Sequence, residues 1–227
     1  MYSRAITAII SAVRVLLSNR RSLLLMLAVY IGLLAAIYLF VSTREATVCQ
    51  LLLTFITVIV APALFFVLQA ATVSYASGPI SRGLIKNSFK LIVVSVPVIA
   101  LTLVAVYSLN KLQTHPTIVT TVRYLLLTVI VPLLIVQLWI SVSNGGIKCL
   151  RNVLARAFAP QSVLVYACGF LIFAVVPYLL LQKTMPNARP WLEMSLFVVR
   201  LGLSALLILL GWVTTVGALS ILSAKRT

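Results

Sequence analysis

The chain has few of the groups that enzymes use for chemistry. Its 227 residues include 2 acidic residues and 1 histidine, against 18 lysines and arginines. Acid–base, nucleophilic and metal-assisted catalysis each need a positioned pair or cluster of such groups. Neither acid, Glu45 or Glu193, is predicted at the centre of an apolar segment, so the buried carboxylate typical of proton-coupled carriers is also missing. We therefore expect no enzyme activity, no catalytic residue and no resident cofactor.

Metal-binding patterns are absent as well. The three cysteines, Cys49, Cys149 and Cys168, form neither a C-x-x-C pair nor the C-x-x-C-H signature of a covalent c-type haem. The single histidine, His115, lies in the loop sequence NKLQTHPT, directly before Pro116. A metal or pigment role and simple solvation in the loop are both open for this side chain, and we favour solvation. The sequence predicts free thiols and no metal site.

Apolar residues dominate what is present. Hydrophobic residues make up 63% and charged residues 9% of the chain, whereas soluble domains have roughly 45–50% and about 25%. Runs of about 20 apolar residues can cross a bilayer. We therefore predict an all-α, polytopic integral membrane helix bundle in a single domain, 1–227. The predicted spans lie near 22–42, 48–73, 89–109, 118–142, 161–181 and 195–222.

The net charge of +16 would suggest nucleic acid as a partner in a soluble protein. Here the cations flank apolar spans, where they set topology and contact anionic headgroups. Most of the Lys and Arg side chains fall on the side that carries the N-terminus, and the positive-inside rule then places both termini in the cytoplasm. We expect a bacterial inner (cytoplasmic) membrane protein with anionic lipids as partners and no nucleic acid.

Three basic segments have the periodicity of amphipathic helices. The segment 1–21 precedes the first span, and the elbows 74–88 and 143–160 join spans on the predicted cytoplasmic side. In each, cations recur at steps of three or four residues, which places them on one helix face. We predict that these segments lie in the membrane interface. The predicted contacts with anionic lipid are Arg4, Arg14, Arg82, Lys86, Lys90, Lys148, Arg151 and Arg156.

A weak internal repeat joins these elbows to proline-containing spans. Pro62 and Pro132 each precede a glutamine, a small polar exit, a basic elbow and a further span that contains Pro97 or Pro177. Two parallel units with an extra helix at each end would produce this pattern. Over residues 48–227 it resembles multi-pass bacterial inner-membrane families of uncharacterised function, including the membrane domain attached to some glycerophosphodiester phosphodiesterases. The resemblance implies an architecture and carries no catalytic residue, because the phosphodiesterase domain is missing here.

Several side chains inside the spans suggest contacts between helices. Gln69 and Gln137 lie where an amide can form hydrogen bonds with a neighbouring helix, and Gly211, Thr214 and Ala218 give the last span a small face for packing within the chain or against a partner. The tryptophans Trp139, Trp191 and Trp212 lie near predicted span ends and are typical of interfacial anchors. We also expect Glu193 to pair with Arg189 or Arg200, four residues before it and seven after. These features predict packing rather than chemistry.

Two functions from different classes fit these observations. The first is a non-enzymatic integral membrane subunit or scaffold that stabilises or organises a larger membrane assembly, for which an energy-transducing complex is one setting. Its partners would be other membrane protein subunits. The second is a small-solute transporter or permease component, suggested by the parallel units and the prolines within spans. An intramembrane enzyme would need a catalytic pair that the sequence does not supply. We favour the subunit.

Overall fold

The computed structural model describes residues 2–43, 47–77, 83–111, 116–145, 152–183 and 189–224. These residues form helices and contain no strand. The predicted all-α fold is confirmed, and so are six helices long and apolar enough to cross a membrane. The chain is therefore a multi-pass membrane protein. The spanning segments are Arg20–Ser42, Val48–Ser74, Leu84–Lys111, Thr117–Ser143, Pro160–Gln182 and Trp191–Ala224.

The first two spans form a helical hairpin, which we call hairpin 1. Its second helix begins with a capping box, in which Thr47 and Gln50 exchange side-chain and backbone hydrogen bonds. A bend precedes its first helix, where the Asn19 side chain accepts a hydrogen bond from the Ser22 N–H. The elements are α1 (Tyr2–Ser18), then α2 (Arg20–Ser42) and α3 (Val48–Ser74) of the hairpin, and the 3₁₀ turn η1 (Tyr75–Ser77) after it.

The remaining described helices form two further hairpins. Hairpin 2 comprises α4 (Leu84–Lys111), α5 (Pro116–Leu125), the π-helical turn η2 (Leu126–Ile130) and α6 (Val131–Gly145). A short helix follows, α7 (Val153–Ala157). Hairpin 3 comprises α8 (Pro160–Phe170), the π-helical turn η4 (Leu171–Val175), α9 (Val176–Gln182) and α10 (Pro190–Ala224).

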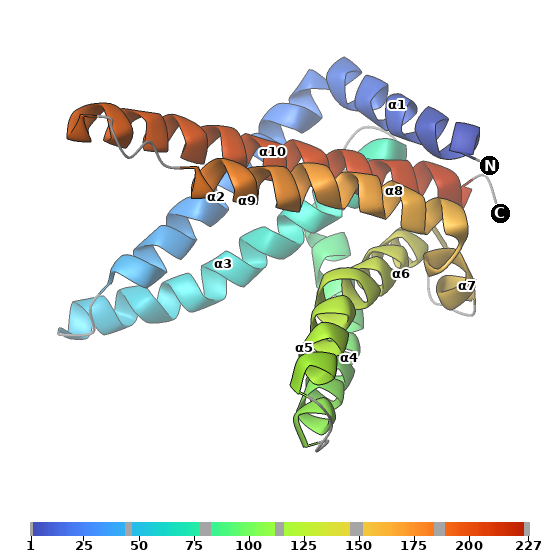
Figure 1. Cartoon of the computed structure of the whole chain (residues 1–227), viewed down its shortest axis with the longest axis horizontal. Coiled ribbons are helices and arrows are strands. Elements are labelled where there is room, and N and C mark those ends of the chain that lie inside the picture. The colour runs from blue at the N-terminus through green and yellow to red at the C-terminus, as the bar shows by residue number, and fades with distance from the viewer. Residues whose placement is uncertain are drawn as a thin grey trace.

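The three hairpins point in different directions and meet at one end of the molecule (Figure 1). This convergent end comprises α1, η1, α7 and the adjoining ends of α3, α6, α8 and α10, and α1 lies along α10 and α8 there. Both ends of the chain also lie at this end (Figure 1). Buried residues are concentrated here, along 68–75 at the end of α3 and the start of η1, along 133–142 in α6 and along 213–223 in α10. The outer halves of the hairpins keep most of their apolar side chains exposed.

One boundary and the grouping of the spans differ from the prediction. The third span was predicted to begin near Phe89 after an elbow, but α4 already begins at Leu84. Lys86 and Lys90 are therefore exposed on the first turns of a spanning helix, where a long cationic side chain can reach the interface. The described spans also pair as hairpins. Each proline-containing unit predicted from the sequence therefore consists of the second span of one hairpin and the first span of the next.

Candidate functional site

The first helix has three distinct faces. At 3.6 residues per turn, the centres of these faces lie about 120° apart. Ala5, Ala8, Ala12 and Leu16 are buried against the bundle, with Ala5 and Ala12 at 0% exposure. The other two faces are largely exposed: Ile6, Ile10, Val13 and Leu17 form an apolar one. The polar one consists of Arg4, Thr7, Arg14 and Ser18, which are exposed, and Ser11, which is half-buried. A helix with a protein face, an apolar face and a cationic face fits the boundary between bilayer and headgroups.

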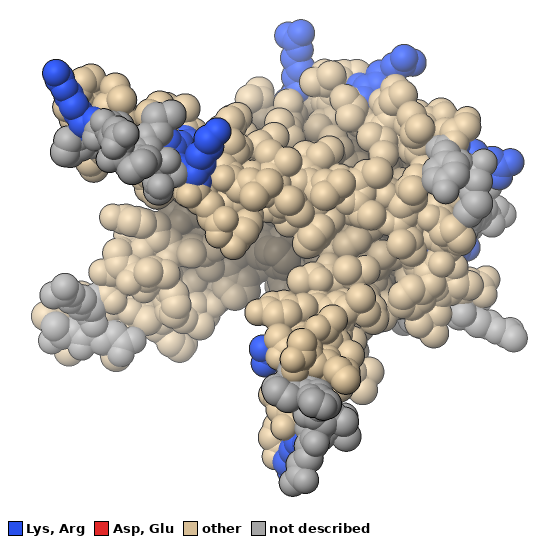
Figure 2. All heavy atoms as spheres, in the orientation of Figure 1, with Lys and Arg blue, Asp and Glu red and all other residues tan. Residues whose placement is uncertain are grey.

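Five of the predicted lipid-contacting cations belong to the described residues, and all five lie on elements at or next to the convergent end. Arg4 and Arg14 are exposed on α1, Lys86 and Lys90 are exposed at the start of α4, and Arg156 is half-buried in α7. In the view of Figure 2, cationic side chains project from the extremities of the molecule and the surface between them is uncharged. The other predicted contacts, Arg82, Lys148 and Arg151, lie outside the described residues.

Interhelical polar contacts join the hairpins at this end. The Trp212 indole N–H donates to Gln69 Oε1 at 2.8 Å, which links α10 to α3. The Ser223 hydroxyl donates to Gln137 Oε1 at 3.0 Å, which links α10 to α6. Within hairpin 2, the Trp139 indole N–H donates to Ser95 Oγ at 2.8 Å. The two glutamines thus connect hairpin 3 to hairpins 1 and 2.

Two of the three tryptophans are therefore not the interfacial anchors that the sequence predicted. Trp139 is 4% exposed and packs edge-on against Phe65 and Phe66, and Trp212 packs edge-on against Phe173. Their position near span ends suggested anchors because hydropathy does not show which face of a helix meets protein. Trp191, at 63% exposure, has the exposure expected of an anchor.

The small face of α10 lies against elements of the same chain. Gly211 is buried so closely against η4 that an added Cβ would lie 3.0 Å from Ile172 and Phe173 side-chain atoms. Ala218 is fully buried in the cluster that contains the alanines of α1. Thr214 is half-buried, and its hydroxyl donates to the Leu210 carbonyl oxygen at 2.8 Å. Gly211 and Ala218 thus pack α10 against η4 and α1 of the same chain.

A buried tyrosine fixes the turn after hairpin 1. The Tyr75 hydroxyl donates to the Val213 carbonyl oxygen of α10 at 3.0 Å, and the side chain is 0% exposed. Burial raises the pKa of this phenol, so it stays protonated and remains a hydrogen-bond donor at physiological pH. The ring fits because residue 217 is a glycine: a Cβ there would lie 1.9 Å from the Tyr75 hydroxyl oxygen. Close backbone approach at Gly217 thus makes the contact between η1 and α10 possible.

Two of the four prolines within spans follow a π-helical turn. Pro132 lies just after η2 and Pro177 just after η4, and in each turn a residue donates to a carbonyl five positions earlier: Val131 N–H to Leu126 and Val176 N–H to Leu171. Because Pro132 has no N–H, the carbonyl four residues before it, that of Thr128, loses its helical donor. The Tyr166 hydroxyl of α8 donates to this carbonyl oxygen at 2.6 Å. A side chain from hairpin 3 thus replaces the donor that the proline of hairpin 2 removed.

Replacing Tyr166 by Phe should therefore leave the Thr128 carbonyl without a donor. We expect a loss of about 1 kcal/mol in unfolding free energy, because the ring can keep its packing while the hydrogen bond disappears. Thermal or denaturant unfolding of the detergent-solubilised protein measures the change. Tyr38→Phe is the matched control, since Tyr38 is 71% exposed on α2. Equal stability of the two variants would show that the carbonyl has another donor.

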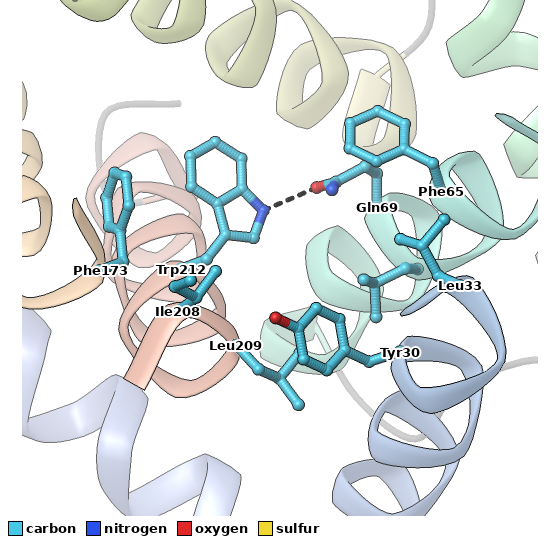
Figure 3. Close-up of a pocket in the computed structure, with 9 residues that line it drawn as sticks. Tyr30, Leu33, Phe65, Gln69, Phe173, Ile208, Leu209 and Trp212 are labelled. Carbon is cyan, nitrogen blue, oxygen red and sulfur yellow. Dashed lines mark hydrogen bonds between the residues drawn. The ribbon is translucent and has the colours of Figure 1, made fainter. Parts of the chain in front are cut away.

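Described residues line two of the cavities that open between helices. The inter-hairpin cavity, about 270 Å³, lies between hairpins 1 and 3 (Figure 3). Its walls are mainly aliphatic and aromatic, with Gln69 and the Tyr30 hydroxyl as polar groups: Tyr30, Leu33, Phe65, Leu68, Gln69, Phe173, Ile208, Leu209 and Trp212. The second cavity, about 520 Å³, lies between α4 and the η2–α6 segment and is bounded by Val153 and Leu154 of α7. Thr102 is the one polar side chain that lines it.

The described residues place no group of three or more His, Cys, Asp or Glu side chains together. Glu193 forms the predicted ion pair with Arg200, at 3.2 Å between Oε1 and the guanidinium. The same guanidinium also donates to the Lys183 carbonyl oxygen, so it connects α10 to the residue that follows α9. Cys49 and Cys168 are free and exposed. Glu45, His115 and Cys149 lie outside the described residues.

No family model matches this chain, and comparison with curated proteins and with solved structures gives no match.

Proposed function

We propose that the protein is a non-enzymatic integral membrane subunit that stabilises or organises a larger membrane assembly. The proposal is supported by the packing of the hairpins. They are joined at the convergent end, while in the most apolar stretches of α3 and α4 only 11% of residues are buried within the chain. Helices in membranes associate through close packing of such faces, so the outer halves offer surface to other helices as well as to lipid. The setting proposed is a bacterial inner membrane, with the convergent end in the cytoplasm.

The chemistry of the described residues is consistent with this role. Gln69, Gln137 and Tyr166 use their polar groups in contacts between helices, whereas many Ser and Thr hydroxyls donate to a carbonyl of their own helix. The acid in the described part, Glu193, is engaged by Arg200. A subunit of this kind needs rigid attachment points and apolar faces rather than a reactive group. An energy-transducing complex is one assembly in which such a subunit would serve.

Transport of a small solute is the second candidate, and the π-helical turns favour it. Such turns frequently occur at functional sites, and η2 and η4 both precede a proline in the middle of a span. However, the two cavities described are lined mainly by apolar side chains. A polar solute would need more hydrogen-bonding groups than Gln69, Tyr30 and Thr102. These cavities fit an apolar ligand better than a water-soluble one.

The first test is extraction from native membranes in mild detergent, followed by size separation and mass spectrometry of the co-migrating proteins. We expect a fixed set of other membrane proteins in constant ratio to this chain. Dissociation of that set in harsher detergent would identify weakly held partners and serves as the control. If the chain migrates alone or with lipid only, the subunit role is contradicted, and solute flux into liposomes becomes the decisive assay.

A further inference from the structure

Two neighbouring polar groups of α6 are buried without a hydrogen-bond partner. The side-chain nitrogen of Gln137 and the hydroxyl oxygen of Ser141 both lack one, and the two residues are 0% and 3% exposed. The oxygen of the Gln137 amide is occupied, because it accepts from the Ser223 hydroxyl of α10 at 3.0 Å. Gln137 Nε2 therefore has N–H groups left to donate, and Ser141 Oγ can both donate and accept.

Gln137 and Ser141 lie on one face of α6. Residues four apart on a helix are neighbours, with Cβ atoms about 5–6 Å apart. Gln137 Nε2 and Ser141 Oγ do not bond to each other, but one small molecule between them can contact both. The elements packed here also carry small side chains. Helix α6 lies against α7 and α10, whose buried residues include Ala157, Ser220 and Ser223.

Burial makes it costly to leave both groups unpaired. In native proteins the large majority of buried polar side-chain atoms have a partner, either in the protein or in ordered water. A buried donor without a partner loses its hydrogen bonds to solvent and gains none in return. Two such groups side by side on one helix face therefore indicate that a molecule bound between them satisfies both.

Burial and charge select the occupant. The low exposure of Gln137 and Ser141 leaves no opening for a lipid chain, and neither residue lines the two cavities described above. Among the described residues no charged side chain is buried, so an ion would lose its hydration without an opposite charge to replace it. A water molecule is neutral, can accept from an amide and can donate to a hydroxyl.

We propose that Gln137 and Ser141 hold one internal water molecule at the contact between hairpins 2 and 3. The water accepts a hydrogen bond from Gln137 Nε2 and donates one to Ser141 Oγ. The Gln137 amide is then fixed from both sides, by the Ser223 hydroxyl of α10 and by the water. The bound water thus forms part of the joint between α6 and α10. This site goes beyond the subunit role, because the isolated protein would hold the water equally well.

A crystal structure of the full chain that resolves ordered water tests the site directly, with crystals grown in sodium bromide. We expect an oxygen-sized density peak at about 2.7–3.2 Å from both Gln137 Nε2 and Ser141 Oγ. The peak should give no anomalous signal at the bromine absorption edge. An empty site would overturn the proposal. A bromide peak at this position would overturn it as well, because the occupant would be an anion.

A double-mutant cycle tests the bridge in detergent solution. Ser141→Ala should lower the Tm of the purified protein by about 4 °C, because the water loses one of its partners. Gln137→Met removes the amide that holds the water. In that background Ser141→Ala should lower Tm by less than about 1 °C, since the hydroxyl has already lost its partner. Gln137→Leu serves the same purpose if Gln137→Met does not fold.

Ser88→Ala is the matched control for this cycle. Ser88 is 5% exposed, and its hydroxyl donates to the Leu84 carbonyl oxygen of its own helix at 2.9 Å. Its effect on Tm should be the same with Gln137 or Met at position 137. A Tm that is unchanged or raised by Ser141→Ala in the parent protein would overturn the proposal, because a hydroxyl without a partner is lost at no cost. Equal falls in both backgrounds would overturn the shared water.

Discussion

Replacing Gly217 by Ala should unfold or severely destabilise the convergent end. The added Cβ would lie 1.9 Å from the Tyr75 hydroxyl oxygen and 2.6 Å from its Cζ. Tyr75 is fully buried, so the ring cannot swing into solvent. It must move with η1 and lose its hydrogen bond to the Val213 carbonyl. Overpacking of a tight core and loss of a buried hydrogen bond together suggest a cost of about 3 kcal/mol. Heating the protein in detergent and recording the temperature at which it ceases to be monodisperse measures the loss of stability.

The same helix supplies a control for this substitution. A Cβ added at Gly202 meets no atom within 4 Å, and this residue is exposed on α10. Gly202→Ala should leave stability unchanged or raise it by up to about 1 kcal/mol, because alanine favours the helix. A second control tests the cause. Tyr75→Leu removes the hydroxyl oxygen, Cζ and Cε1, the three atoms nearest to an alanine Cβ at 217, so the double variant should be no less stable than Tyr75→Leu alone. If the stability losses of the two single substitutions add in the double variant, the cost of Gly217→Ala does not come from contact with Tyr75.

The fold class could be predicted because its signals are local. Each spanning helix is a continuous apolar run, and the length of a run does not depend on what packs against it. The predicted bounds 22–42 and 48–73 differ little from Arg20–Ser42 and Val48–Ser74. The start of α4 was missed because Lys86 and Lys90 read as an interfacial elbow, although exposed lysines are also tolerated on the first turns of a spanning helix.

The contacts between helices were harder to predict, since lipid-facing and protein-facing surfaces are both apolar. On α1 the sequence indicated one apolar and one polar face, but the side that packs on the bundle is the alanine face. The spacing of Ala5, Ala8 and Ala12 carries that signal, because small residues mark close helix approach in membranes. The bulkier Ile6 and Ile10 are exposed instead.

The glutamines and prolines show the same limit. Gln69 and Gln137 were predicted to form hydrogen bonds between helices, but their partners, Trp212 and Ser223, lie more than eighty residues away in the chain and follow from tertiary structure alone. The four prolines within spans look alike in the sequence, but the helices around them differ. The helices α3 and α4 continue through Pro62 and Pro97. In contrast, Pro132 and Pro177 each follow a π-helical turn. The inter-hairpin cavity has no sequence signal, because its walls come from separate helices.

The alanine face of α1 leads to the second large expected effect. Ala12 is 0% exposed, and α1 lies against α10, α8, η1 and α2. Ala12→Leu should push α1 away from these elements, since three added heavy atoms have no space at this contact. We expect a loss of about 2 kcal/mol from overpacking, with the Arg4 and Arg14 face displaced from its position in the interface. Unfolding in detergent measures the loss, and proteolysis at Arg14 in liposomes should become faster.

Val13→Leu is the matched control for this variant, because it adds a methylene group on the next residue of the same helix. Val13 belongs to the exposed apolar face of α1, where a larger aliphatic side chain meets lipid and should change stability by less than about 0.5 kcal/mol. The contrast between the two sites tests the three-faced description directly. If Ala12→Leu and Val13→Leu are equally tolerated, α1 is not packed on the bundle through its alanines. The convergent end would then have to be held together by Tyr75 and the glutamines without this helix.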